Sequence, residues 1–241
     1  MKINVGKTKV MILRKNKRKS QSQNTWFLGE QELQECDSYK YLGVTIKSNG
    51  SFNEHIENMK LKAGKAYYAL ISKCKDFNGL QPSLFLYLFD QTIVPILNYA
   101  SEIWGFDEHA TLERLHLSAC KYILGVKSTT CTDAVYAELG RISLQSNRHV
   151  CMLKFFARLQ SLNVSEPHRL ACKSFRFLCE AADLGCVNWI SRVRELQARY
   201  DILPSDNVSA IKSKVRCFFE NCTLSSLNEH LVQYKKLCTY A

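Results

Sequence analysis

Long apolar runs, glycine and proline are all scarce in this sequence. Its 241 residues include four prolines and ten glycines, too few for a collagen-like or linker-dominated chain. No apolar run approaches the roughly 20 residues that a helix needs to cross a bilayer. The lysine-rich first ten residues do not resemble a secretory signal, and 46% hydrophobic residues indicate a globular chain. We therefore expect an intracellular protein, nuclear or cytoplasmic, with no membrane partner.

The sequence also lacks the motifs on which many active sites are built. It has no glycine-rich phosphate-binding loop, no Gly-x-Ser-x-Gly turn and no His-Glu-x-x-His pair. Nucleotidyl transfer with two metal ions needs clustered carboxylates, yet no Asp-Asp pair occurs and the first 36 residues contain no aspartate. We predict no catalytic residue and no cofactor for this chain.

Cysteine is plentiful, with eleven residues, but no Cys-x-x-Cys pair occurs. A possible set of four zinc ligands lies near the C-terminus: Cys217, Cys222, His230 and Cys238. Their separations do not fit the short spacing with which two thiolates of one turn bind one ion. Zinc stays an alternative, but we expect buried free thiols and assign no metal ligand.

Positive charge is concentrated at the start of the chain. Lysine and arginine number 33 against 22 acidic residues, which gives a formal net charge of +11. No acidic residue precedes Glu30, whereas eight basic residues do: Lys2, Lys7, Lys9, Arg14, Lys15, Lys17, Arg18 and Lys19. A basic segment of this kind favours contact with nucleic-acid phosphates.

The pattern of apolar residues changes from strand-like to helix-like near residue 50. Short β-prone runs predict strands at 8–13, 26–28 and 39–46. Ser51 and Glu54 fit a capping box at the start of a helix over 52–75. Further helices are expected at 82–97 (buried on most faces, and bent or ended by Pro95), 108–124, 130–139, 144–162, 167–184, 188–200, 208–220 and 224–239. The predicted fold class is α+β, predominantly α: a short N-terminal antiparallel β element followed by helices.

Several blocks, in order, resemble one family of proteins. The segment after the catalytic Tyr-x-Asp-Asp turn in reverse transcriptases of non-LTR (LINE-type) retrotransposons looks like Asn4-Val5-Gly6-Lys7-Thr8-Lys9-Val10-Met11. The family's primer grip resembles Tyr39-Lys40-Tyr41-Leu42-Gly43-Val44. Its thumb signature, Tyr-Gly-Ser-Glu-x-Trp after an apolar helix, is similar to residues 93–105, although Ala100 stands where glycine is common. Residues 121–126 and 135–141 continue the likeness, which covers roughly residues 1–160.

The resemblance implies an RNA-directed DNA polymerase that uses two Mg²⁺ ions when intact. In the family the metal-binding aspartates precede the segment at which this chain begins, so we expect this chain alone to be inactive. Three parts are implied: a palm remnant with primer-grip strands at 1–50, a thumb-like helical domain at 51–163 and a C-terminal helical region, or bundle, at 164–241. The implied partners are RNA or an RNA–DNA duplex and a missing N-terminal polymerase region.

Thirteen residues are candidates for nucleic-acid binding, from the charge pattern and the resemblance together. They are Lys7, Lys9, Arg14, Lys15, Lys17, Arg18, Lys19, Tyr41, Leu42, Gly43, Lys60, Lys62 and Lys65. Each also has an ordinary interpretation: Tyr41 in the core beside a tight turn, and the lysines as a solvated strand edge or helix face. Of Tyr67 and Tyr68, one is expected in the apolar stripe of its helix. A stand-alone helical interaction module and a non-functional retrotransposon remnant stay open as alternatives.

Overall fold

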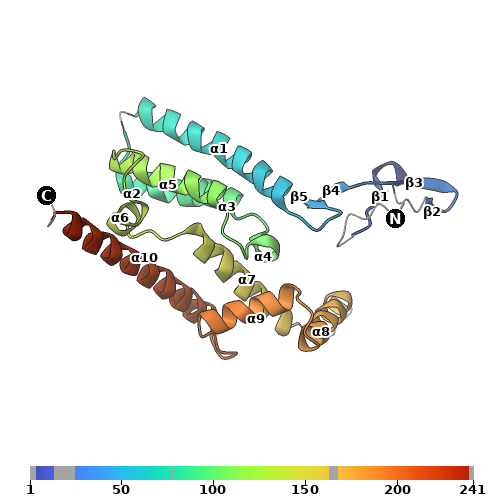
Figure 1. Ribbon diagram of the computed structural model, residues 1–241. Coiled ribbons are helices and arrows are strands. Elements are labelled where there is room, and N and C mark those ends of the chain that lie inside the picture. The colour runs from blue at the N-terminus through green and yellow to red at the C-terminus, as the bar shows by residue number, and fades with distance from the viewer. Residues whose placement is uncertain (1–3, 14–24, 78, 163–167, 239–241) are drawn as a thin grey trace. The chain divides into compact units, whose positions relative to one another are not determined.

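The chain divides into two compact units, Met1–Lys62 and Ala63–Ala241. The computed structural model (Figure 1) describes residues 4–13, 25–77, 79–162 and 168–238. Short strands occupy the first unit and helices make up the second, which confirms the predicted α+β class with a predominance of helix. The three-part division at residues 50 and 163 rests on the resemblance and stays a prediction.

The N-terminal unit contains a turn of 3₁₀ helix and five short strands. They are η1 (Val5–Lys7), β1 (Lys9–Val10), β2 (Trp26–Leu28), β3 (Gln31–Glu35), β4 (Ser38–Tyr41) and β5 (Val44–Lys47). β3 lies between β1 and β2, pairing antiparallel with β2 but parallel with β1. The prediction of an antiparallel element is therefore wrong for β1. β3 was not expected because its sequence, QELQE, has one apolar residue and no β-prone run.

The predicted strand 39–46 is a hairpin of two strands, β4 and β5. Leu42 and Gly43 form its two-residue turn, with φ of +46° and +86°. Two positive φ values are what a tight hairpin turn of type I′ requires. Tyr41, next to the turn, is 60% exposed, so its assignment to the core is wrong.

The first long helix, α1 (Asn53–Asp76), begins close to the predicted residue. The Ser51 hydroxyl accepts a hydrogen bond from the Asn53 backbone N–H at 3.3 Å, as a capping residue does. Glu54 does not complete the capping box. Its carboxylate lies 3.2 Å from the Lys47 ammonium and accepts a hydrogen bond from the Ser38 hydroxyl.

The helical unit contains nine further helices in the described part of the chain. They are α2 (Pro82–Thr92), α3 (Val94–Leu97), α4 (Ser101–Trp104), α5 (Ala110–Leu124), α6 (Thr132–Glu138), α7 (Leu144–Gln160), α8 (Arg169–Asp183), α9 (Trp189–Arg199) and α10 (Val208–Cys238). α10 was predicted as two helices, but no glycine or proline interrupts it. The predicted helix 82–97 is divided near Pro95, and α2 buries Phe85 and Phe89 while leaving Tyr87 60% exposed.

One hydrophobic core lies around α7, which packs against α4, α9 and α10. Met152 and Phe156 of α7 are buried together with Ile190 and Val193 of α9 and Val215 of α10. Burying each such side chain contributes about 1.5–3 kcal/mol to folding. In the described residues, no helix combines the length and apolar character needed to span a membrane.

Candidate functional site

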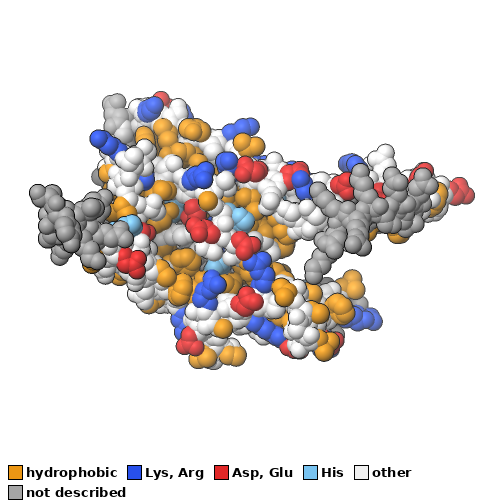
Figure 2. Space-filling model, in the orientation of Figure 1, with side chains coloured by type: hydrophobic (Ala, Val, Ile, Leu, Met, Phe, Trp, Pro, Cys, Tyr) orange, Lys and Arg blue, Asp and Glu red, His pale blue; other side chains and the backbone are white. Residues whose placement is uncertain are grey.

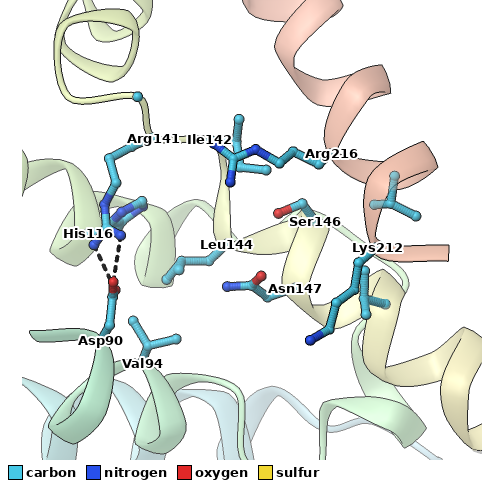
Figure 3. Close-up of a pocket in the computed structure, with 13 residues that line it drawn as sticks. Asp90, Val94, His116, Arg141, Ile142, Leu144, Ser146, Asn147, Lys212 and Arg216 are labelled. Carbon is cyan, nitrogen blue, oxygen red and sulfur yellow. Dashed lines mark hydrogen bonds and ion pairs between the residues drawn. The ribbon is translucent and has the colours of Figure 1, made fainter. Parts of the chain in front are cut away.

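A cavity of about 420 Å³ lies where α2, α5, α7 and α10 approach the loop between α6 and α7. Its lining carries three basic side chains, Arg141, Lys212 and Arg216, and one acidic side chain, Asp90. Figure 3 shows Lys212 and Arg216 extending from α10 toward the cavity, whereas Arg141 is turned toward Asp90. The excess of positive charge favours an anion over a cation as occupant.

Two of the three basic groups already have acidic partners. Arg141 donates two hydrogen bonds to the Asp90 carboxylate, both at 2.7 Å, and Asp90 raises the pKa of Arg141 although burial acts to lower it. Arg216 donates to the Glu220 carboxylate at 2.6 Å. Lys212 is exposed and forms no ion pair with the described residues. The attraction for an anion therefore depends mainly on Lys212.

Beside the cavity, Glu113 of α5 joins three groups of α7. Its carboxylate accepts hydrogen bonds from the backbone N–H groups of Leu144 and Gln145, each at 3.1 Å, at the start of α7. A carboxylate is favourable there because the first N–H groups of a helix have no partner within the helix. The same carboxylate accepts a hydrogen bond at 2.9 Å from Arg148, whose side chain is fully buried.

His116, one helical turn after Glu113, extends this network toward α6. Its Nδ1 atom lies 3.3 Å from the Tyr136 hydroxyl and 3.9 Å from the Glu113 carboxylate. Burial acts to raise the pKa of Glu113, but His116 and Arg148 outweigh it, and the net pKa is lowered. Burial raises the pKa of Tyr136 well above its ordinary value, so that hydroxyl stays protonated. The hydrogen bonds of Glu113 and His116 therefore join α5, α6 and α7.

The sequence-predicted residues of the N-terminal unit lie in η1, β1 and the hairpin. The side chains of Lys7 and Lys9 are exposed, and the Tyr39 hydroxyl donates a hydrogen bond at 3.2 Å to the Lys7 carbonyl. The hairpin turn exposes Tyr41 and Leu42, the latter to 75%, next to Gly43. Five predicted basic residues lie outside the described residues: Arg14, Lys15, Lys17, Arg18 and Lys19.

The predicted lysines of α1 do not share one environment. Lys62 and Lys65 are exposed and one helical turn apart, whereas Lys60 is half-buried and lies 3.2 Å from the Glu57 carboxylate. Tyr67 is buried against Phe89, which confirms that one of the two tyrosines belongs to the apolar stripe. Tyr68, by contrast, is 71% exposed, one turn beyond Lys65. Lys62, Lys65 and Tyr68 therefore lie on the solvent side of α1.

No large surface of a single charge sign is visible on the face of the helical unit drawn in Figure 2. Basic side chains there are interspersed with acidic and hydrophobic ones. This agrees with the sequence, in which eight of the eleven net positive charges lie before Glu30. A nucleic-acid contact on this face of the helical unit would therefore depend on a few lysines rather than on a broad basic patch.

The cavity residues were not predicted from the sequence, although one signal was available. Lys212 and Arg216 are four apart, which places them on one face of a helix. Arg141 follows Gly140 and carried no such signal, because its partner Asp90 is distant in the sequence.

A comparison with curated proteins relates the chain to transposons. An uncharacterized transposon-derived protein of Caenorhabditis elegans is 29% identical over 126 residues, which is 47% of this chain. The aligned region covers 43% of that relative's length. No protein-family model matches the chain, and no solved structure matches it. The similarity supports a transposon origin and does not extend to polymerase activity.

Proposed function

We propose that this chain derives from a non-LTR retrotransposon reverse transcriptase and binds an RNA–DNA template–primer duplex. The observation that carries the proposal is the solvent side of α1, where Lys62, Lys65 and Tyr68 are exposed together. The similarity to a transposon-derived protein and the order of the family-like blocks along the chain support it. The charge at the N-terminus supports it as well.

The spacing of these side chains suits a phosphate backbone. The exposed Lys73, whose ammonium lies 3.2 Å from the Asp76 carboxylate, follows Lys62 by three helical turns, a distance of about 16 Å along the helix axis. Successive phosphates of one strand advance about 3.4 Å along double-stranded DNA, and less along an A-form RNA–DNA duplex, so this helix face spans at least about five of them. Tyr68 could add a stacking contact with a base, which typically contributes about 1–3 kcal/mol.

The turn of the β4–β5 hairpin is a second surface that we expect to contact the nucleic acid. Leu42 has a left-handed backbone, which costs a leucine roughly 1–2 kcal/mol relative to ordinary conformations. Strained turns of this kind are frequent at binding sites. Gly43 has no side chain to keep a nucleic-acid strand away from the backbone. We assign Tyr41, Leu42 and Gly43 the role of holding the primer strand.

Salt-dependent binding tests the proposal directly. Binding of a fluorescently labelled RNA–DNA duplex to the full chain is measured by anisotropy over a range of salt concentrations. The double variant Lys62→Gln/Lys65→Gln should weaken binding and reduce the slope of log affinity against log salt by about 2, since each lost phosphate contact removes about 0.9.

The matched control is Lys127→Gln/Lys173→Gln, which also removes two exposed lysines but from outside α1. Its net charge equals that of the first variant, so general electrostatic attraction falls equally in both. Equal losses in the two variants, or no binding of the unaltered chain at low salt, would refute the assignment to α1.

A second candidate function is protein interaction, favoured by the outer face of α8. Leu170 and Phe177 lie two turns apart on this helix and are 80% and 68% exposed. Leu184 and Val187, just beyond it, are each 85% exposed. Groups of exposed large apolar side chains mark interaction surfaces. Self-association seen by light scattering, abolished by Leu170→Gln/Phe177→Gln in a chain that binds no duplex, would establish this function instead.

A further inference from the structure

Three side chains with metal-ligand chemistry meet where α6 and α10 pack together. Cys131 immediately precedes α6, Asp133 lies in its first turn, and His230 lies on α10. The Cys131 Sγ atom, a carboxylate oxygen of Asp133 and a ring nitrogen of His230 are all within 4.8 Å of one another. Cys131 and Asp133 are neighbours in the sequence, but His230 is distant from both, so only the fold reveals the group.

These separations are close to those of a zinc site. Zinc binds cysteine sulfur at about 2.3 Å and histidine nitrogen or carboxylate oxygen at about 2.0–2.2 Å. Tetrahedral geometry with these bonds places ligand atoms roughly 3.3–3.8 Å apart. Cys131 and His230 are both exposed, so side-chain rotation can bring their ligand atoms the remaining distance.

The kinds of donor favour zinc over the hard cations. Magnesium and calcium prefer sites made wholly of oxygen, whereas thiolate with imidazole selects zinc among the common divalent ions. Asp133 also has the outer partner that metal-bound carboxylates usually have, because the Ser226 hydroxyl donates a hydrogen bond to it at 2.5 Å. Ser226 lies one turn before His230 on α10, so this helix supplies both the histidine ligand and the hydroxyl that holds the Asp133 carboxylate.

We propose that Cys131, Asp133 and His230 bind one Zn²⁺ ion, with water as the fourth ligand. Three protein ligands and an open position are typical of zinc sites that exchange a ligand, as opposed to closed structural sites with four. On binding, the Cys131 thiol loses its proton to solvent and the sulfur bonds to the ion, so affinity falls as the pH falls. The ion would connect α10 to α6.

This site differs from the ligand set that the sequence suggested. Cys217, Cys222 and His230 all lie on the single helix α10, and Cys217 is about 20 Å from His230 along its axis. Residues so far apart on one straight helix cannot bind the same ion. His230 belongs instead with the two residues that α6 brings beside it.

Zinc binding by the full chain tests the proposal. After treatment with a chelator, the protein is titrated with Zn²⁺ and its metal content is measured by mass spectrometry after dialysis. We expect one zinc per chain, and at least a tenfold loss of affinity in Cys131→Ser and in His230→Ala. Ser226→Ala should weaken binding by roughly tenfold, since outer partners contribute 10–100-fold. Substituting Co²⁺ should give a sulfur-to-metal charge-transfer band that Cys131→Ser abolishes.

Two cysteines on α10 provide matched controls. Cys217 and Cys222 are exposed like Cys131 but lie outside the group, so Cys217→Ser and Cys222→Ser should bind zinc as the unaltered chain does. Far-ultraviolet circular dichroism of every variant without metal checks that α6 and α10 still form. The proposal is overturned if the unaltered chain retains no stoichiometric zinc. It is equally overturned if the control variants lose zinc while Cys131→Ser retains it.

Discussion

Glu113 is the residue on which the arrangement of α5 and α7 depends most directly. Its carboxylate is the partner of the buried Arg148 guanidinium and of two backbone N–H groups at the start of α7. Removing one member of a buried ion pair leaves an uncompensated charge and typically costs about 3–5 kcal/mol. The pair as a whole need not stabilise the fold by that amount, because both groups are also withdrawn from water.

We predict that Glu113→Gln lowers the free energy of unfolding at pH 7 by about 3 kcal/mol. The amide keeps the size of the side chain but cannot neutralise Arg148. Urea denaturation of the two proteins measures the difference. Glu57→Gln, which removes an exposed carboxylate paired with Lys60, is the control and should change stability by less than about 1 kcal/mol.

The effect of Glu113→Gln on the free energy of unfolding should also depend on pH. The pKa of Glu113 is lowered in the folded chain, so its contribution is complete above the ordinary value of 4.5 and is lost as pH falls through the folded pKa. The stability difference between the unaltered chain and Glu113→Gln should therefore shrink below pH 4.5. A difference that stays constant down to pH 3 would show that the carboxylate charge is not what stabilises the junction.

Single residues also show what sequence patterns could and could not predict. Arg148 follows Leu144 and precedes Met152 by four residues each, and all three are buried on one face of α7. This burial was not predicted from the sequence, because the partner that neutralises the arginine, Glu113, is distant along the chain and is evident only from the fold. Ala100, which stands where the resembling family commonly has glycine, has φ of +57°. Glycine adopts this conformation without strain, which gives a physical reason for the family preference.

Among the elements, α4 and α7 approach each other closely because residue 105 has no side chain. A Cβ atom on Gly105 would lie 2.6 Å from the Ser101 carbonyl oxygen and 2.9 Å from the Cβ atom of Arg148. Both distances are below van der Waals contact. Because one neighbour is backbone and the other begins a fully buried side chain, neither can move cheaply.

We predict that Gly105→Ala destabilises the chain by about 2–3 kcal/mol, as overpacking of a core commonly does. Gly64, in the interior of α1, is the control: a methyl group added there meets no atom of the described residues within 4 Å. Because alanine is the better helix former by about 1 kcal/mol, Gly64→Ala should stabilise. Thermal unfolding followed by circular dichroism measures both shifts. Shifts of the same sign would contradict the close-packing argument.

The elements differed in how well the sequence predicted them, and the reason is physical. Helices with a clear apolar stripe and a glycine after their last turn, such as α5 before Gly125, matched closely, because both signals are local. β3 could not be predicted, since its residues are mostly polar and exposed and only its pairing with β1 and β2 makes it a strand. α10 was predicted as two helices with a break at 221–223, yet this stretch contains neither glycine nor proline and the helix continues through it.

For the molecule as a whole, the buried apolar side chains and the concentrated positive charge lie in different parts of the chain. Among the described residues before Ser51, Val44 is the one buried apolar side chain of the core, and the residues of β2 are all exposed. The same region carries the eight basic residues that precede the first acid. If the proposed origin is correct, this region would be part of a polymerase palm, and its strands would pair within a larger sheet.

We therefore predict that a chain beginning at Ser51 folds without residues 1–50. Its free energy of unfolding should fall by no more than about 3 kcal/mol relative to the full chain, because Val44 is the one buried core side chain that is removed from the described residues. Urea denaturation measures this change. A chain that ends before Val208 is the contrasting variant: it loses the buried Ile211 and Val215 and should be strongly destabilised.

The chain that begins at Ser51 should also bind an RNA–DNA duplex more weakly, since it lacks the basic segment and the hairpin. Loss of duplex binding from a chain that still unfolds cooperatively would separate binding from folding, whereas failure of residues 51–241 to fold would show that the strands support the helical core.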